Sequence, residues 1–370
     1  MSDVIHMVCF DAPSPPDYGG AIDLYYKVQA LAKAGKKIIL HYFSYKEGRS
    51  AAGLESYCQE IHAWKRGSFW NSLVKRQPYI VSSRINAQMI ERINADDHPV
   101  LMEGIHCSGI LPLLKPEKKV VLRLANDEAI YYTQLFLTEK NVLRKIYFQR
   151  EYRLLSTYQL RLPENLPIAA LSSEDAERFH KKYGFTNVKF LPCFSPWQEV
   201  KSLTGKGSYC LYHGNLSVPE NRQAAIWLAK KVFSGLDHEL VIAGKQASGL
   251  KKLLHGKGRL RIVENPSDQE LTALIREAHI NVLPSLNRTG VKFKLLHALF
   301  EGRFCLTNLA GVAGSGLDSA VVLAEDVDSI RNEINRLMAS EFTENEIHLR
   351  KNLLHLYNNE KNARELSALL

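Results

Sequence analysis

The distribution of apolar positions along the chain predicts buried strands that alternate with helices. Short apolar runs with the length of buried strands recur through the first half, at residues 4–10, 37–43, 60–64, 100–103, 120–124, 168–171 and 188–191. Helical spacing separates most of these runs; in residues 21–34 it ends before Gly35, which stands where a left-handed helix cap is expected. This alternation indicates a parallel sheet covered by helices.

The alternation starts again after a proline-containing, polar stretch at residues 192–208, which is typical of an interdomain linker. Further strands are predicted at 209–213, 240–243, 260–263, 280–283 and 305–308, with helices at 219–233, 247–255 and 268–278. One long helix is predicted from Tyr131 to about Leu162, and helical, charged segments from Asp328 to Leu370. The fold class is therefore α/β, with two doubly wound domains in succession.

Composition and charge narrow the function classes. An apolar content of 45% and a charged content of 24% are typical of a soluble globular protein. We expect neither a signal peptide nor a membrane span, and the scattered cysteines, without a Cys-x-x-Cys pair, indicate free thiols in a reducing cytoplasm. The net charge of +9 is spread over both halves, which argues against a nucleic-acid partner and suits a phosphate-rich ligand or an anionic surface.

The stretch from Leu283 to Arg303 carries the main candidate site. An apolar run is followed by a turn with Gly290 and by a helix that begins near Lys292 and Lys294. A helix start offers unpaired N–H groups and partial positive charge, so strand, turn and helix together predict a phosphate-binding cradle. The alternative is an ordinary connecting loop with two solvated lysines.

Other predicted strand ends of the second half supply further polar groups. His213-Gly214-Asn215 and Ala243-Gly244-Lys245 follow two strands, and ligands of doubly wound sheets bind at the carboxyl ends of strands. Together these groups predict binding of a phosphorylated ligand. Gly311–Gly316 matches no dinucleotide fingerprint and no Walker motif occurs, while Asp326 and Asp328 are expected to cap a helix rather than to bind a metal.

Three strand ends of the first half are weaker candidates. The Gly19-Gly20 turn follows the first strand and opens a helix, although such a turn is often only a turn. His106 follows the strand 100–103 and could orient a hydroxyl or move a proton, or be a structural or surface histidine. Asp127 and Glu128 open the long helix, where the helix dipole favours acidic residues even without an acceptor to bind.

Two stretches mix basic and aromatic residues. Lys65–Arg76 contains Phe69 and Trp70 among four cations, a composition that suits an anionic membrane surface as well as ordinary solvent. For the basic stretch of the helix from Tyr131 we expect a solvated helix that packs its aromatic residues inward.

These motifs resemble those of the GT-B glycosyltransferases, specifically of the retaining, metal-independent group called family 4 or group 1. The resemblance is carried by the Pro15-Pro16…Gly19-Gly20 turn, Tyr212–Asn221, Ile242–Lys245 and Thr289–Leu296. An Asn-x-Glu-x-x-Tyr-Tyr element at Asn126–Tyr132 points to a bacterial polysaccharide-type branch.

The resemblance implies two Rossmann-like domains that face each other across a cleft. It implies a first, acceptor domain at residues 1–198, a second, nucleotide-sugar domain at 199–345, and C-terminal helices at 346–370 that return to the first domain. The implied donor-binding residues are Gly19, Gly20, Gly214, Asn215, Lys245, Thr289, Gly290, Lys292 and His297. His106 and Lys294 are the implied catalytic residues, and Asp127 and Glu128 would bind the acceptor, a glycan or lipid-linked glycan.

The implied reaction is hexosyl transfer from a nucleoside diphosphate sugar to a hydroxyl, with no cofactor, no metal and no nucleic acid involved. The expected location is the cytoplasm, at the inner face of the membrane if Lys65–Arg76 binds lipid. The chain departs from the family at its usual pair of glutamates, where Asn287–Thr289 and His297 stand instead. This departure motivates the alternative of a catalytically silent nucleotide-sugar sensor or scaffold in polysaccharide assembly.

Overall fold

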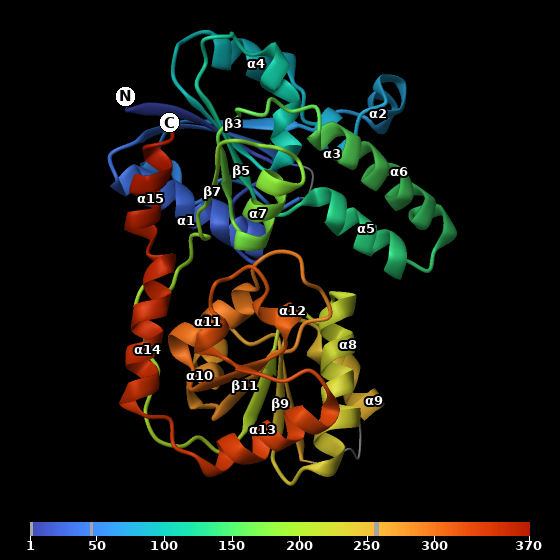
Figure 1. Ribbon diagram of the computed structural model, residues 1–370, viewed down its shortest axis with the longest axis vertical. Helices are drawn as coiled ribbons and strands as arrows, with labels where there is room; N and C mark the ends of the chain where they lie inside the picture. The colour runs from blue at the N-terminus through green and yellow to red at the C-terminus, as the bar shows by residue number, and fades with distance from the viewer. Residues whose placement is uncertain (1–2, 45–46, 255–258) are drawn as a thin grey trace. The chain divides into compact units, whose positions relative to one another are not determined.

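The computed structural model describes residues 3–44, 47–254 and 259–370 and divides into two compact units (Figure 1). One unit comprises the chain up to Pro196 together with Tyr357–Leu370, and the other comprises Trp197–Leu356. Each unit is described by itself below.

Within the described residues, the first unit is built on a seven-stranded parallel sheet with the order β3-β2-β1-β4-β5-β6-β7. Its strands are β1 (Val4–Cys9), β2 (Lys37–Ser44), β3 (Cys58–Lys65), β4 (Val100–Glu103), β5 (Val120–Leu124), β6 (Ile168–Ala170) and β7 (Val188–Phe190). These strands confirm the predicted ones to within two residues at each end. β1 lies beside β4, although two strands separate them in the sequence, so the strand order reverses between β1 and β4. Doubly wound sheets bind their ligands at such a reversal.

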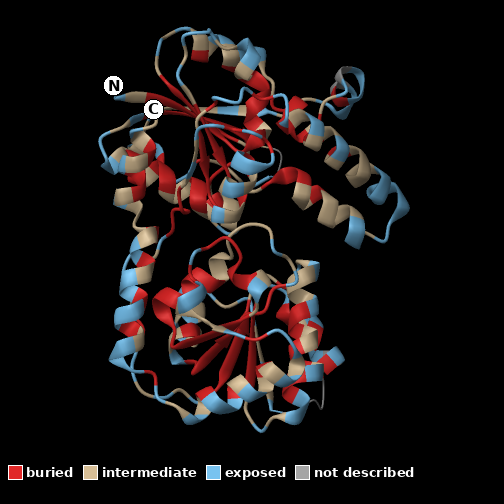
Figure 2. Ribbon diagram, in the orientation of Figure 1, coloured by how far each residue is buried: buried red, intermediate tan, exposed pale blue. Residues whose placement is uncertain are grey.

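Helices cover both faces of this sheet, and its inner strands β1, β2, β4, β5 and β6 are mostly buried, whereas the edge strands β3 and β7 are partly exposed (Figure 2). The helices are α1 (Gly19–Lys33), α2 (Phe69–Lys75), α3 (Tyr79–Ser82), α4 (Ala87–Asn94), α5 (Glu128–Thr138), α6 (Val142–Gln159), α7 (Ser173–Lys181) and α15 (Asn359–Ser367), with the 3₁₀ helices η1 (Glu55–Tyr57) and η2 (Ile105–Leu113). One core contains residues of α1 and α15 and the other contains residues of α4, α5, α6 and α7. Residues alternate between the two cores along each strand; in β1, Met7 faces the first and Val8 the second.

The prediction of one long helix from Tyr131 to Leu162 was wrong, because the chain forms a hairpin of α5 and α6 (Figure 1). Glu139 ends α5 by accepting hydrogen bonds from the backbone N–H groups of Lys140 (2.8 Å) and Asn141 (2.9 Å). Asn141 then caps α6 by accepting from the N–H of Arg144 at 3.1 Å. Polar side chains thus replace the helical hydrogen bonds at the break without a proline or glycine.

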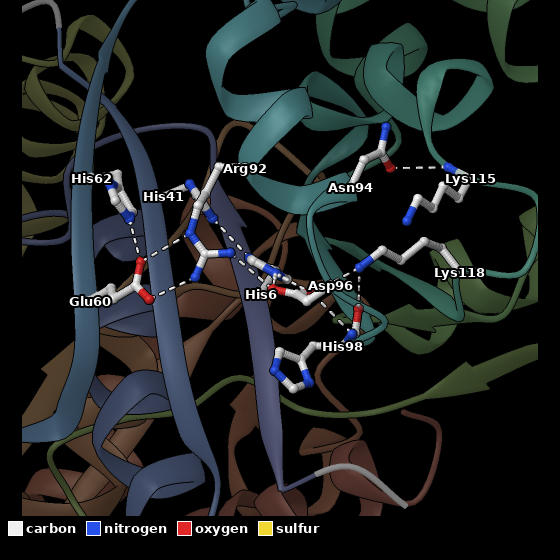
Figure 3. Close-up of polar contacts among 10 residues, drawn as sticks. All are labelled: His6, His41, Glu60, His62, Arg92, Asn94, Asp96, His98, Lys115 and Lys118. Atoms are coloured by element: carbon white, nitrogen blue, oxygen red, sulfur yellow. Dashed lines mark hydrogen bonds and ion pairs between the residues drawn. The ribbon is translucent and has the colours of Figure 1, made fainter.

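A chain of hydrogen bonds joins β3, β2 and β1 to Asp96, and Figure 3 shows its part from His41 through His6 to Asp96. Trp64 Nε1 donates to Nδ1 of His41 at 3.2 Å. His41 Nε2 lies 3.0 Å from Nδ1 of His6, and His6 Nε2 lies 3.1 Å from both oxygens of Asp96. An indole N–H can only donate a hydrogen bond, so Nδ1 of His41 accepts. Nε2 of His41 then donates to Nδ1 of His6, and Nε2 of His6 donates to Asp96. Each histidine therefore carries one ring proton and is neutral. Arg92 and Lys118 hold the Asp96 carboxylate at 2.9 and 3.0 Å.

The second unit contains, in the part of the chain that the structure describes, a six-stranded sheet with the order β10-β9-β8-β11-β12-β13. The strands are β8 (Cys210–His213), β9 (Leu240–Gly244), β10 (Leu260–Glu264), β11 (Ile280–Val282), β12 (Phe304–Thr307) and β13 (Val322–Leu323). All pairs are parallel, as predicted, and the strand order reverses between β8 and β11. Of these strands only the two-residue β13 was not predicted.

Helices also flank the second sheet, with α10 and α11 on one side and α8 on the other (Figure 1). The helices are α8 (Pro219–Trp227), α9 (Lys251–Leu254), α10 (Asp268–Glu277), α11 (Phe293–Glu301), α12 (Leu309–Val312), α13 (Val327–Ala339) and α14 (Glu344–Leu354). Shorter turns are the π-helix η3 (Leu228–Val232) and the 3₁₀ helices η4 (Phe233–Gly235), η5 (Ala247–Leu250), η6 (Asp318–Ala320) and η7 (His355–Tyr357). The last residue of the helix predicted at 247–255, His255, lies outside the described residues.

The C-terminal segment rejoins the first unit later than the sequence suggests. Helix α14 belongs to the second unit, where Arg350 is buried and donates to the carbonyl oxygens of Leu299 (3.3 Å), Gly302 and Arg303. The segment of the first unit therefore starts at Tyr357 and not at residue 346. Asp326 caps α13 by accepting from the N–H of Ser329 at 2.8 Å, as predicted for this acidic stretch.

Candidate functional site

A pocket opens in the second unit where the strand order reverses. It has a volume of about 120 Å³ and is formed by the segments that follow β8 and β11. The residues that line it are Val218, Glu220, Asn221, Pro284, Ser285, Leu286, Asn287, Lys292 and Lys294. The pocket lies at the carboxyl ends of the strands, at the point where the strand order reverses, and doubly wound sheets bind their ligands there.

Lys294 lies in the first turn of α11 and is the central cation of this pocket. Its Nζ donates to the Tyr212 hydroxyl and to Oδ1 of Asn221, both at 3.3 Å, and lies 4.8 Å from the centre of the Tyr212 ring. These partners are neutral. Burial and then the neighbouring Lys292 lower the pKa of Lys294 to about 7, whereas Glu220 acts in the opposite direction. An anion in the pocket would restore the charge on this ammonium group.

The turn before α11 is held in shape by its own polar groups. Asn287 Oδ1 accepts from the N–H of Thr289 at 2.7 Å and from its hydroxyl at 2.8 Å. Lys292 Nζ donates to the carbonyl oxygen of Gly290 at 3.0 Å, and Gly290 has a φ of +68°, which favours glycine. Lys292 is also the N-cap residue, and its side chain gives no capping hydrogen bond. The N–H of Leu295 donates to the carbonyl oxygen of Lys292 at 2.9 Å, so the amides of Phe293 and Lys294, at the very start of α11, are those that an anion would meet.

The strand ends of β8 and β9 approach each other through two glycines. A Cβ atom on Gly244 would lie 1.8 Å from the carbonyl oxygen of Gly214, so no other residue fits there. The side chain of Asn215 accepts from the N–H (3.0 Å) and hydroxyl (2.6 Å) of Ser217, which shapes the loop that leads to α8. Lys245 is exposed after β9, and it is not among the residues that line the pocket.

We expect Gly244→Ala to destabilise the second unit by at least about 3 kcal/mol, because its methyl group overlaps the Gly214 carbonyl. Gly205→Ala is the matched control in the same unit, since Gly205 has a φ of +77° but no atom within 4 Å of an added Cβ. That change should cost only about 1 kcal/mol of backbone strain. Urea unfolding of both variants measures the difference, and equal losses would refute the close approach.

His297 is buried on α11, next to His213 at the end of β8, and does not line the pocket. Its Nε2 is 3.1 Å from the Thr272 hydroxyl, and its ring stacks on Trp197 with the centres 4.4 Å apart. Burial lowers its pKa to about 4, so this histidine is neutral at physiological pH. These contacts are those of a core residue and leave the donor-binding role suggested for His297 without support from its position.

Sequence reasoning did not single out Tyr212 and Asn221 as site residues. Both fall within the Tyr212–Asn221 motif, and the Tyr212 hydroxyl donates to the carbonyl oxygen of Asn221 at 3.0 Å. Asn221 also donates from Nδ2 to the carbonyl oxygen of Asn215 at 3.0 Å. The pair therefore ties the loop after β8 to Lys294. Their signal was the place of Tyr212 near the end of strand β8 and of Asn221 in the first turn of α8.

In the first unit, His106 lies at the switch point between β1 and β4. It belongs to η2, directly after Gly104, and its ring stacks on Phe10 from the end of β1 with the centres 5.0 Å apart. Its Nδ1 is enclosed and has no hydrogen-bond partner among the described residues. Burial and then the guanidinium of Arg84 hold its pKa well below the ordinary value, so the imidazole is neutral.

Gly19 and Gly20 begin α1 near this histidine. A Cβ atom on Gly20 would lie 3.1 Å from the Phe10 ring, the same ring that stacks on His106. The glycine turn and the histidine therefore share one neighbour at the carboxyl edge of the sheet. Arg84, which sequence reasoning missed, also reaches this edge and donates to the carbonyl oxygen of Phe10 at 2.8 Å.

Asp127 and Glu128 have different environments although they are adjacent. Asp127 caps α5 through the N–H of Ala129 at 3.1 Å and accepts from the Tyr183 hydroxyl at 3.0 Å. Its oxygens are used in holding the helix. Glu128 is buried, and burial raises its pKa to about 7 against a hydrogen bond from Asn126. Glu128 therefore has a carboxyl group that can gain or lose a proton near neutral pH.

In the described ranges, no group of three or more His, Cys, Asp or Glu side chains is placed to hold a metal ion. No helix of the described chain is both long enough and apolar enough to cross a bilayer.

Comparisons with known proteins agree with this geometry. Residues 207–340 match the family model described as "Glycosyl transferases group 1". A Klebsiella pneumoniae protein, described as an uncharacterized 44.6 kDa protein in the cps region, is 28% identical over 344 residues, which is 87% of each chain.

Two solved structures share the fold at low identity. Sucrose-phosphate synthase from Thermosynechococcus elongatus has a TM-score of 0.71 and 14% identity, covering 99% of this chain and 98% of its own. A TarM mutant from S. aureus, solved with fondaparinux, alpha-GlcNAc-glycerol and UDP, has a TM-score of 0.66 and 9% identity and covers 99% of each chain. The chain has the GT-B fold, and its residues 207–340 are similar to the group 1 glycosyltransferases.

Proposed function

We propose that the chain transfers a hexosyl group from a nucleoside diphosphate sugar to a hydroxyl group of a glycan or a lipid-linked glycan. The observation that carries this proposal is the position of Lys294. It lies in the first turn of α11, at the switch point of the second sheet, with neutral hydrogen-bond partners and a pKa lowered to about 7. A group of this kind needs an anionic ligand to hold its charge.

The donor diphosphate would bind at the start of α11. The open amides of that helix, its dipole and the ammonium groups of Lys292 and Lys294 offer positive charge on one side of the pocket. As the sugar leaves, negative charge grows on the diphosphate, and cations held in place stabilise that charge most in the transition state. This arrangement supports a reaction in which lysine side chains, and not a metal ion, stabilise the negative charge on the leaving diphosphate. Retention of configuration, as in family 4 enzymes, is part of the proposal.

The first unit would hold the transferred sugar and the acceptor. His106 is neutral and its Nδ1 is enclosed, which leaves its other ring nitrogen to hydrogen-bond a sugar hydroxyl. Glu128 can accept or donate a hydrogen bond near neutral pH, since its pKa is raised to about 7. Asp127 would affect acceptor binding only indirectly, because it caps the start of α5, where Glu128 lies.

The named relatives guide the choice of substrates. The TarM structure was solved with UDP and a GlcNAc-glycerol, so UDP-sugars are the first donors to test. The K. pneumoniae relative lies in a cps region, which supports a polysaccharide as the product. All six cysteines are free, as expected for an enzyme that works in a reducing cytoplasm.

The test is acceptor-dependent release of the nucleotide, which is a nucleoside diphosphate from UDP-, GDP- and ADP-sugars and CMP from CMP-sugars. We expect turnover with one nucleotide class, reduced about a hundredfold in His106→Ala, because a positioned hydrogen bond to the reacting sugar is lost. His348→Ala, on the exposed side of α14, is the control and should keep full activity. Tight donor binding without turnover on any acceptor would instead favour the nucleotide-sugar sensor or scaffold.

A further inference from the structure

Exposed apolar side chains concentrate on α2 and on the tip of the α5–α6 hairpin. Trp70 is 73% exposed and Val74 84%, while Leu143 at the hairpin tip is 78% exposed. The other exposed apolar residues of this group are Phe69, Leu73, Leu137, Val142 and Ile146. A cluster of this size is unusual for a face that only meets water.

The two elements form one structure. Arg150, in the middle of α6, donates to the carbonyl oxygen (3.0 Å) and hydroxyl (3.1 Å) of Ser72 in α2. The Phe69 and Tyr147 rings lie 6.0 Å apart, and the Arg150 guanidinium stands 5.6 Å from the centre of the Phe69 ring. These contacts hold α2 beside α6, and we call the exposed apolar and basic residues of α2 and of the hairpin tip together the basic apolar surface.

The same region is strongly basic. Residues 65–76 and 137–153 contain nine Lys and Arg and two Glu, a net charge of +7 in a chain whose total is +9. One of the two glutamates, Glu151, is buried beside Arg150 at 2.5 Å and adds little negative charge to the exterior. The cations Arg144 and Lys145 flank the exposed Leu143 and Ile146 directly.

We propose that the basic apolar surface docks the protein on an anionic membrane. Its aliphatic tip and Trp70 would enter the interface between headgroups and acyl chains, and its cations would bind lipid phosphate. A second copy of the chain is a poor occupant, because two such surfaces would oppose +7 with +7. Inserting the tip leaves the core intact, since the hairpin aromatics Tyr147, Phe148 and Tyr152 pack inward.

This surface differs from the one suggested by sequence. The sequence pattern assigned lipid binding to Lys65–Arg76 and treated the basic stretch after Tyr131 as a solvated helix. The inward packing of the aromatic residues agrees with that expectation. The exposed aliphatic residues of the hairpin tip do not agree with the expectation of a solvated helix. They make the hairpin the main part of the proposed membrane-binding surface. The proposal does not depend on sugar transfer.

The test is sedimentation of the full chain with vesicles of phosphatidylcholine alone and with phosphatidylglycerol added, without donor or acceptor. We expect binding to the anionic vesicles that weakens as salt rises. Arg144→Gln with Lys145→Gln should lower the partition coefficient roughly 30-fold, at about fivefold for each cation removed. Leu143→Glu with Ile146→Glu should lower it at least about tenfold.

Leu160→Glu is the matched control, because Leu160 is 62% exposed at the opposite end of the same helix and should change binding little. Absence of binding to anionic vesicles at low salt would overturn the proposal. Equal binding by the tip variants would overturn it as well. Concentration-dependent dimers that the Leu143→Glu change abolishes, with no vesicle binding, would assign the surface to a second copy instead.

Discussion

Replacing Lys294 by Met lowers kcat for sugar transfer about a hundredfold to a thousandfold, the loss seen when one fixed charge-stabilising group is removed. The change keeps the length and apolar body of the side chain, which lies over the Tyr212 ring, and removes only the ammonium group. The stability of the second unit should therefore change little. Initial rates with saturating donor, together with thermal unfolding of the variant, separate loss of chemistry from loss of structure.

Lys294→Arg is the informative control for this experiment. Arginine stays charged at every pH used, whereas the pKa of Lys294 is lowered to about 7. Donor affinity of the unaltered protein should rise as pH falls from 8.5 to 6.5, because the charged ammonium binds the diphosphate. Donor affinity should not change with pH in either Lys294→Arg or Lys294→Met. Unchanged kcat in Lys294→Met would remove this residue from the site.

Lowering the pH from 6.5 to 4 destabilises the first unit through its histidine chain. His6 and His41 are neutral in the fold, with pKa values lowered to about 4 and about 2, mainly by burial. In the unfolded chain both titrate near 6.5. Below that pH the unfolded state binds more protons than the folded state, so stability falls with pH. Each histidine contributes about 1.4 kcal/mol for each pH unit.

Other titratable groups of the first unit change the pH dependence of its stability in known directions. A hydrogen bond to Glu60 raises the pKa of Arg92, which therefore keeps its charge over the whole range. Hydrogen bonds hold the pKa of Glu60 at about 2, so its contribution is lost only below about pH 4.5. Elsewhere in the unit, Glu128 and Asp175 have raised pKa values of about 7 and about 6 and partly offset the loss as pH falls.

His41→Gln tests this account, because the amide keeps one donor and one acceptor but does not titrate. We expect its stability to depend less on pH, by about 1.4 kcal/mol per unit between pH 6.5 and 4. Urea unfolding followed by hydrogen-exchange labelling of β1 and β2 reports the first unit by itself. An equal pH slope in the variant would show that the histidine chain does not control acid stability.

The fold could be predicted because buried parallel strands leave a strong local signal. Strands such as Val100–Glu103 and Leu240–Gly244 are apolar on both faces and end in glycine-containing turns, so their positions follow from composition and spacing. The α5–α6 break could not be predicted in this way. It depends on Glu139 and Asn141 capping two helices, in a sequence that contains no helix-breaking residue.

The site could be predicted only in part, for a related reason. Lys294 follows from its place after a strand and a turn, since a helix start has known chemistry. His297 and Asp127 carry the same kind of signal, yet their contacts with Trp197 and Tyr183 are those of core residues. Whether a polar side chain faces a ligand or the core depends on partners distant in sequence. Asn221 and Arg84 were missed for that reason.

The most direct test of the account is calorimetric titration of UDP-sugars and GDP-sugars into the unaltered protein, Lys294→Met and Lys294→Arg. Binding in two buffers of different ionisation enthalpy also measures the protons taken up. The account predicts one preferred nucleotide class, proton uptake near pH 7.5 in the unaltered protein, no uptake in Lys294→Arg, and binding weakened at least about tenfold in Lys294→Met. Equal affinity in all three proteins, or no binding of any nucleotide sugar, would contradict it.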